Sequence, residues 1–180
     1  MAVAYLIVVI AYALVDHAAF ASSGAPATRT RREWTYWMVV GPYYASFGAP
    51  ALEIASGTAH PTLGSMIAGG ACIALAAGLR WVGVTTLGTS FSASVETHDG
   101  HRLVDHGVFS FIRHPLYLGL VLLFVGLPLF AGARLSWAVT VLGVIGIGVR
   151  ILAEERWLSQ HLAGYSDYMR RTKRLIPGVW

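Results

Sequence analysis

Five long apolar stretches, spread over the whole chain, constrain the fold more than any other feature of the sequence. A helix needs about 20 apolar residues to cross the hydrocarbon core of a bilayer. Only 12% of the 180 residues are charged, well below the roughly 25% typical of soluble domains. The sequence therefore predicts an all-α fold, a polytopic membrane helix bundle of about five transmembrane helices. The predicted spans are residues 2–21, 34–55, 63–87, 115–132 and 135–153.

Length and hydropathy also indicate a single domain. The apolar stretches extend over all 180 residues, and the mean hydropathy is +0.60. One integral membrane domain over residues 1–180 is therefore expected. The fifth apolar stretch continues into the polar segment 150–180, where we expect the chain to leave the membrane and form a C-terminal cytoplasmic helix.

Positive charges are distributed unevenly across this arrangement. With residue 1 outside, all 13 lysines and arginines except Arg134 fall in inner loops or at the inner ends of spans, as the positive-inside rule requires. We therefore expect the N-terminus outside and the C-terminus in the cytoplasm. This basic rim explains the net charge of +4 without a nucleic-acid partner. The excess of arginine over lysine, with abundant alanine and glycine, favours a bacterial source and hence the bacterial inner membrane.

Two segments are neither lipid-facing nor simple connections. Residues 90–115 are far longer than the roughly 2–8 residues usual between neighbouring helices. The segment 150–180 carries two adjacent carboxylates, Glu154 and Glu155, at the predicted membrane edge. Carboxylates are costly there unless cations face them. Both segments are therefore expected to serve the function.

Four motifs in these segments follow one another in a characteristic order. They are HxLVxxG, RHPxYxG, EExxL and YxxYxxxxxRxIP, with an apolar hairpin between the second and the third. This pattern resembles that of the isoprenylcysteine carboxyl methyltransferases, within a wider family that includes the phospholipid N-methyltransferases. The resemblance covers residues 79–180. It departs from the family at Val108 and Phe109, where many members have Pro-Tyr.

The resemblance implies S-adenosylmethionine-dependent methyl transfer to a carboxylate of a lipophilic, isoprenoid or lipid-like substrate that enters from the bilayer. Residues 88–180 would form the cofactor-binding and catalytic part, and residues 1–80 would shape the lipid-substrate side. The implied cofactor-binding residues are His101, Leu103, Val104, Gly107, Arg113, His114, Pro115, Tyr117, Gly119, Glu154 and Glu155. The implied catalytic residues are Arg174, which would orient the substrate carboxylate, and Glu155.

The chemistry of the RHPLYLG stretch suits the methionine carboxylate of this cofactor. Pro115 fits the first position of a helix, where an amide donor would otherwise go unpaired. The positive end of that helix, with its free amides, forms an anion site beside Arg113 and His114. Tyr117 shares a helical face with both residues, and Gly119 permits a close backbone approach.

The paired glutamates would supply the opposite charge. Glu154 and Glu155 are expected either to face the cofactor's ammonium or to lock Arg113 in place. Glu154 is explained equally well by a surface ion pair with Arg150, four residues earlier on the same helix face. Without the neighbouring motifs, Arg113 would be read as an arginine that extends its charge to the membrane surface.

The HRLVDHG stretch offers backbone donors and acceptors, with Leu103 and Val104 as an apolar seat for adenine. The histidines of residues 98–114 fit no compact set of ligands, so no metal is expected. Three ionisable residues in the apolar spans are expected to make capping or polar contacts inside the bundle: Asp16, His17 and Glu53.

Three other functions remain open at this point. A lipid amine is one alternative acceptor, and Glu155 would then be the first candidate for the general base. Sterol-type reductases have a similar cofactor-binding end but use NADPH and normally carry more spans. A non-enzymatic membrane protein on the same scaffold would bind neither cofactor. The complete set of motif residues favours the methyltransferase.

Overall fold

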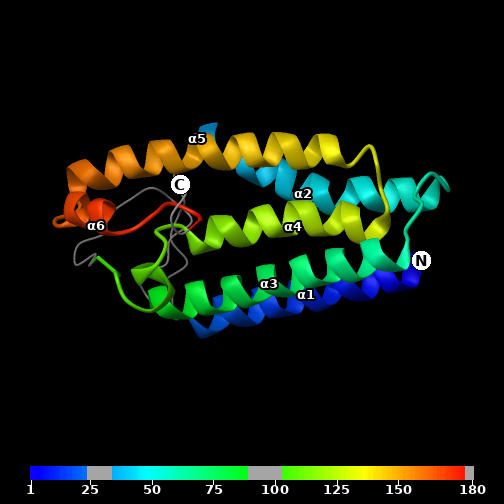
Figure 1. The fold of residues 1–180 in the computed structure, drawn as a ribbon, viewed down its shortest axis with the longest axis horizontal. Coiled ribbons are helices and arrows are strands. Elements are labelled where there is room, and N and C mark those ends of the chain that lie inside the picture. The colour runs from blue at the N-terminus through cyan, green and yellow to red at the C-terminus, as the bar shows by residue number, and fades with distance from the viewer. Residues whose placement is uncertain (24–33, 89–102, 177–180) are drawn as a thin grey trace.

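The computed structural model describes residues 1–23, 34–88 and 103–176, and every element of regular secondary structure in these ranges is a helix. Five long helices lie side by side, and two short ones cover one end of the bundle (Figure 1). In chain order they are α1 (Ala2–Ser22), α2 (Trp34–Ala55), α3 (Leu63–Leu87), η2 (Gly107–Ser110), α4 (Pro115–Ala131), α5 (Trp137–His161) and α6 (Tyr165–Arg171).

Helix α4 occupies the middle of the bundle, with α3 on one side and α2 and α5 on the other (Figure 1). It is apolar around its whole circumference, as expected of a helix surrounded by other helices. Leu123, Phe124 and Leu127 of α4 have no solvent exposure and belong to the two apolar clusters that form the core. Helix α4 therefore determines where the residues just before it, 113 and 114, are placed.

The predicted all-α membrane bundle is confirmed. Length and composition make α1, α3 and α5 each able to cross a membrane, and α4 is a shorter apolar helix of 17 residues. The first three helices agree with the predicted spans to within one residue. Helix α5 differs because it continues to His161, well beyond the predicted end of the span at residue 153. This extension carries both glutamates.

Close packing of α3 against α4 depends on glycines. A Cβ atom on Gly69 of α3 would lie 2.3 Å from the backbone nitrogen of Phe130. Small residues of this kind allow membrane helices to approach closely. Gly119 of α4 lies in the same interface, where an added Cβ would meet the Ala76 carbonyl oxygen at 3.3 Å. The close approach expected at Gly119 is thus made by α3, and its place beside a cofactor stays a prediction.

Two of the three ionisable residues in the apolar spans make the predicted contacts. Glu53 of α2 accepts hydrogen bonds from the Ser136 amide at 2.7 Å and the Ser136 hydroxyl at 2.6 Å, just before the start of α5. Asp16 of α1 forms an ion pair with Arg80 of α3. The prediction is wrong for His17, which is exposed. Neighbouring helices are therefore joined by polar contacts as well as by apolar packing.

Candidate active site

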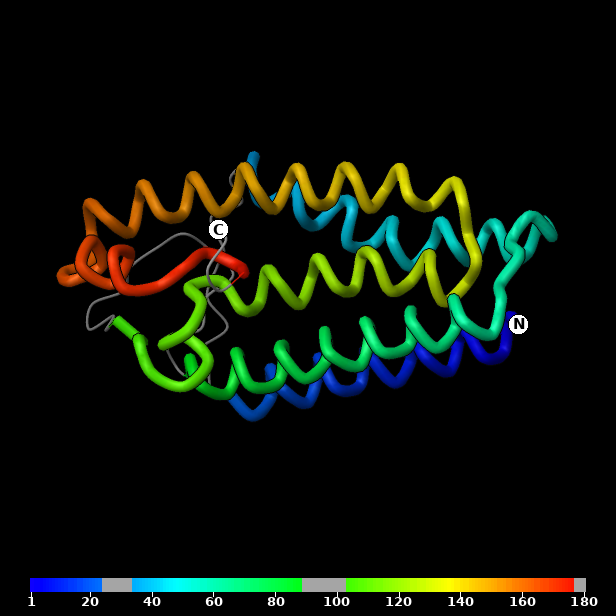
Figure 2. Tube along the Cα trace, viewed as in Figure 1, coloured from blue at the N-terminus to red at the C-terminus, as the bar shows by residue number. Residues whose placement is uncertain are grey.

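The predicted functional residues gather at the end of the bundle where α5 extends beyond the other helices. Helix α6 and the segment around η2 lie at this end, opposite Met1 (Figure 1). Figure 2 shows the chain around residues 172–176 running back toward the start of α4. A parallel backbone bridge joins Ile112 to Lys173 there. Segments far apart in the sequence thus meet at one place.

Glu155 lies at the centre of the site and accepts contacts from three positively charged or ionisable side chains. Arg113 Nε lies 2.8 Å from its Oε1 atom, and Arg174 Nε lies 2.8 Å from its Oε2 atom. His114 Nε2 lies 3.3 Å from Oε1. The Glu155 side chain is 4% exposed, against 26% for Arg174. A carboxylate buried this deeply needs such partners, and here two arginines face one carboxylate.

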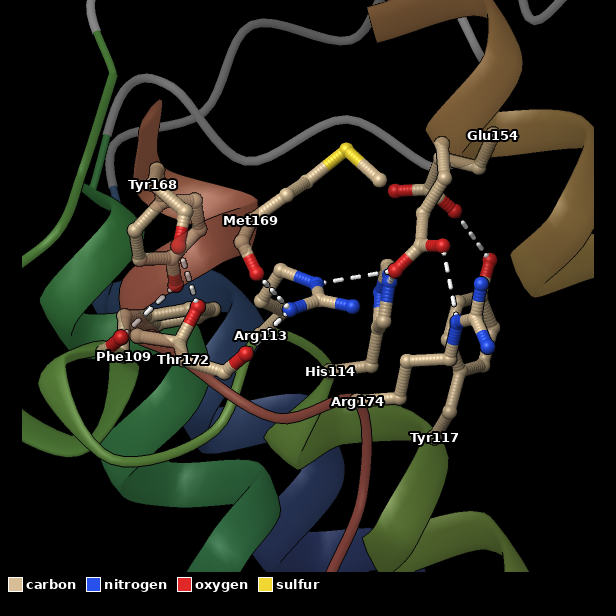
Figure 3. Close-up of polar contacts among 10 residues, drawn as sticks. Phe109, Arg113, His114, Tyr117, Glu154, Tyr168, Met169, Thr172 and Arg174 are labelled. Carbon is tan, nitrogen blue, oxygen red and sulfur yellow. Dashed lines mark hydrogen bonds and ion pairs between the residues drawn. The ribbon is translucent and has the colours of Figure 1, made fainter. Parts of the chain in front are cut away.

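Arg113 also connects the site to α6. Its Nη1 atom donates to the Met169 carbonyl at 3.0 Å and to the Thr172 carbonyl (Figure 3). Carbonyls at the end of a helix have no partner within that helix and carry partial negative charge. The Arg113 side chain is 7% exposed. It is therefore a buried link between α5 and α6, and the alternative of a surface-seeking anchor is wrong.

The backbone just before α4 is paired with the C-terminal segment. Pro115 is at the first position of the helix, as predicted. The Arg113 amide, however, donates to the Lys173 carbonyl at 2.8 Å, and the His114 amide donates to the Arg174 carbonyl at 3.0 Å. The two amides are paired because the C-terminal segment forms a backbone bridge with this stretch. The anion site expected at the amides of the helix itself stays a prediction.

A second polar contact lies beside the first. The Tyr117 hydroxyl of α4 donates to Glu154 Oε2 at 2.7 Å (Figure 3), and both side chains are half-buried. The Tyr117 ring lies 5.5 Å from the His114 ring, centroid to centroid, so the two side chains share a face as predicted. Glu154 and Glu155, although adjacent, thus contact different groups.

Arg150 is a residue whose importance sequence reasoning missed. It was considered only as a surface partner of Glu154, yet it is 4% exposed. Its Nη1 atom donates to the Thr35 hydroxyl of α2 at 2.7 Å. An arginine within an apolar stretch is itself a signal of function, but nothing in the sequence points to Thr35 as its partner.

The remaining predicted residues, His101 apart, belong to the segment 103–107, which lies beside α6. Leu103 and Val104 are half-buried, and Leu103 lies against Gly164, in the turn before α6. Gly107 begins η2 with a positive φ of 59°, which favours glycine. His101 lies outside the described residues. Among the residues that are described, no group of three or more histidine, cysteine, aspartate or glutamate side chains is arranged to hold a metal ion.

Tyr168 joins α6 to the segment before α4. Its hydroxyl donates to the Phe109 carbonyl at 2.7 Å, and both residues are buried. Burial raises the pKa of the Tyr168 hydroxyl to about 12, with a smaller opposing effect from the Arg113 charge. The phenol therefore keeps its proton, and with it this hydrogen bond, at neutral pH.

Comparison with known proteins gives a consistent result. The model of the isoprenylcysteine carboxyl methyltransferase (ICMT) family matches residues 69–160, which include both glutamates but not Arg174. A probable protein-S-isoprenylcysteine O-methyltransferase of Oryza sativa subsp. indica is 31% identical over 105 residues, covering 56% of this chain and 55% of the relative. The protein-S-isoprenylcysteine O-methyltransferase of Dictyostelium discoideum is 30% identical over 122 residues, covering 62% of this chain and 48% of the relative. The chain thus spans about half the length of these relatives.

A solved structure is also similar. The structure of the eukaryotic intramembrane Ras methyltransferase ICMT superimposes with a TM-score of 0.60 and 26% sequence identity. The superposition covers 79% of this chain and 51% of that one. The similarity therefore extends beyond the segment that the family model matches, into the N-terminal helices.

Proposed function

Because the chain belongs to the isoprenylcysteine carboxyl methyltransferase family, we propose that it transfers a methyl group from S-adenosylmethionine to a carboxylate of a lipophilic substrate. The relatives named above are O-methyltransferases of S-isoprenylcysteine. A carboxylate on an isoprenoid or another lipid-like molecule is the corresponding acceptor here. Its apolar tail would lie in the bilayer and its carboxylate would reach the site at the end of the bundle.

The observation that carries this proposal is the pairing of a positively charged cluster with a neighbouring carboxylate. Arg113 and Arg174 both face the single carboxylate of Glu155. Two guanidinium groups suit two anions, the cofactor's methionine carboxylate at Arg113 and the acceptor's carboxylate at Arg174. Glu154 accepts a hydrogen bond from a neutral tyrosine hydroxyl, and a carboxylate can accept several more. It therefore suits the cofactor's ammonium. Arg113 and Glu154 together match the two charges at the methionine end.

Glu155 acts in this scheme as a positioning residue. Both of its oxygens already accept contacts from cationic side chains, so it is poorly suited to bind an ammonium or to take a proton from an amine. We infer that it holds the guanidinium groups of Arg113 and Arg174 in place. Arg174 is the most exposed member of the cluster, and we assign it the substrate carboxylate. Its planar guanidinium can hold a carboxylate through two parallel hydrogen bonds.

S-adenosylmethionine supplies an electrophilic methyl group when bound. An acceptor carboxylate is ionised at neutral pH and needs no general base. One of its oxygens forms the new bond to the methyl carbon as the carbon–sulfur bond breaks, which leaves a methyl ester and a neutral thioether. The negative charge of the carboxylate and the positive charge of the sulfonium are both lost in this reaction. Arg174 therefore contributes mainly by aligning the acceptor carboxylate with the methyl group. The buried surroundings contribute by excluding water.

Methyl transfer with matched acceptors tests the proposal. The purified chain would be incubated with cofactor carrying a deuterated methyl group and with an S-isoprenyl cysteine that has a free carboxylate. The same molecule as its carboxamide, and a lipid amine, are the controls. We expect label only in the carboxylate compound, in an ester that mild base removes. Base-stable label in the lipid amine would contradict the proposal, as would binding of NADPH without binding of S-adenosylmethionine.

A further inference from the structure

Arg150 is a buried cation to which the proposed chemistry gives no task. It lies on α5, with 4% of its surface exposed, and donates to the Thr35 hydroxyl at the start of α2. An arginine buried within a membrane bundle is costly, so it is kept where it serves a function and has partners. Thr35, a neutral hydroxyl, does not by itself account for a buried guanidinium.

Its other contacts lead toward the site. The Tyr117 hydroxyl interacts with Arg150 as well as with Glu154. Arg150 and Glu154 are four residues apart on α5 and therefore lie on the same face of that helix. Three helices contribute to this group: α2 through Thr35, α4 through Tyr117, and α5 through the two charged residues.

The hydrogen-bonding capacities of these groups determine which of them donates to and which accepts from the Tyr117 hydroxyl. A guanidinium only donates, and an ionised carboxylate only accepts. Tyrosine has one hydroxyl proton, and it points to Glu154 Oε2 at 2.7 Å. The side of the Tyr117 oxygen that faces Arg150 therefore accepts. A guanidinium on that side favours the rotation of the Tyr117 hydroxyl in which its proton stays on Glu154.

We propose that Arg150 is a positioning residue that is held by Thr35 of α2 and orients the Tyr117–Glu154 pair for the cofactor's ammonium. The inference rests on the proposed function and extends it, because it gives α2 a part in cofactor binding. Helix α2 lies outside the segment that the family model matches and packs along α5 (Figure 1). The N-terminal helices would then affect the cofactor as well as the lipid substrate.

Calorimetric titration with S-adenosylhomocysteine, the demethylated product that keeps the ammonium, tests this on the purified full chain. Arg150→Met should weaken binding about tenfold, as expected for the loss of one hydrogen bond to a charged group. Thr35→Val should weaken it about threefold, and should add nothing to Arg150→Met because both act through the same contact. Arg156→Met is the matched control, since Arg156 is an exposed arginine on the same helix. The affinity of Arg156→Met for S-adenosylhomocysteine should equal that of the wild type.

Melting temperatures measured on the same samples separate positioning from a purely structural role. If Arg150→Met lowers the melting temperature but leaves affinity unchanged, Arg150 is only an anchor and the inference is overturned. Should this variant fail to fold, Thr35→Val and Tyr117→Phe decide, and unchanged affinity in both would overturn it. If the wild type itself does not bind, the proposed function fails, and this inference fails with it. Binding by the wild type with equal binding by the variants refutes the inference alone.

Discussion

Replacement of Glu155 by glutamine tests the logic of the site most directly. The change keeps the size of the side chain but removes the charge that two arginines face. An amide has one oxygen where the carboxylate has two, so the glutamine cannot accept from both Arg113 Nε and Arg174 Nε, each of which now lies 2.8 Å from its own carboxylate oxygen. At least one guanidinium must therefore lose its contact with residue 155.

The magnitude follows from burial. Breaking a buried ion pair by removing one partner typically costs about 3–5 kcal/mol. Arg113 is 7% exposed and retains two carbonyl partners, and Arg174 is 26% exposed. The lower end of this range, about 3 kcal/mol, is therefore expected. For a chain of this size it corresponds to a fall in melting temperature of about 6–12 °C. Turnover should fall as well, because both arginines lose their orientation.

Glu154→Gln is the matched control, because it makes the same chemical change one residue earlier. Glu154 is half-buried and contacts a neutral hydroxyl, so stability should change by only about 1 kcal/mol. Affinity for S-adenosylmethionine should instead fall about tenfold. Thermal unfolding and cofactor titration of both purified variants would measure this. Equal stability in the two variants would refute the central role of Glu155, and an affinity loss confined to Glu155→Gln would reverse the two assignments.

Three further predictions concern the acceptor, the membrane and the packing. Arg174→Lys keeps the charge but loses the planar fork, so cofactor affinity should be nearly unchanged while single-turnover methylation slows at least about tenfold; equal losses of both would place Arg174 in the cofactor site. The distribution of basic residues predicts that reporter fusions after residue 25 and at the C-terminus both report cytoplasm, and an external signal from either would overturn the topology. Gly69→Ala should destabilise the protein by about 1–3 kcal/mol, because the new Cβ would meet the Phe130 backbone. By contrast, Gly78→Ala, where a Cβ meets nothing within 4 Å, should leave stability unchanged or raise it.

The helices were predictable because the signals that define them are local. Apolar length set the bounds of the first three helices, and Pro115 marked the start of α4. The end of α5 was predicted too early because apolar length marks where a membrane span ends, whereas the helix itself continues through polar residues to His161. The sequence therefore predicted the bundle better than the part that extends beyond it.

The partners of the site residues were not predictable, because they are distant in the sequence. Arg113 is 42 residues from Glu155 and 56 from Met169. Motifs indicated that these residues matter without indicating which touches which. The same holds for the amides of residues 113 and 114, whose carbonyl partners lie in the C-terminal segment.

The two adjacent glutamates are neighbours in the sequence but contact different groups in the structure. Successive residues on a helix of about 3.6 residues per turn point about 100° apart, so Glu154 and Glu155 leave the helix in different directions. Glu155 faces the cations before α4 and after α6, and Glu154 faces Tyr117. One carboxylate thus holds arginines, and the proposed function assigns the other to the ligand. Since Arg174 belongs to the segment after α6 while Arg113 precedes α4, the positive cluster is complete only when that segment lies against the bundle. The Lys173 and Arg174 carbonyls hold it there by accepting hydrogen bonds from the amides of residues 113 and 114, so these backbone contacts place Arg174 where the proposed function needs it.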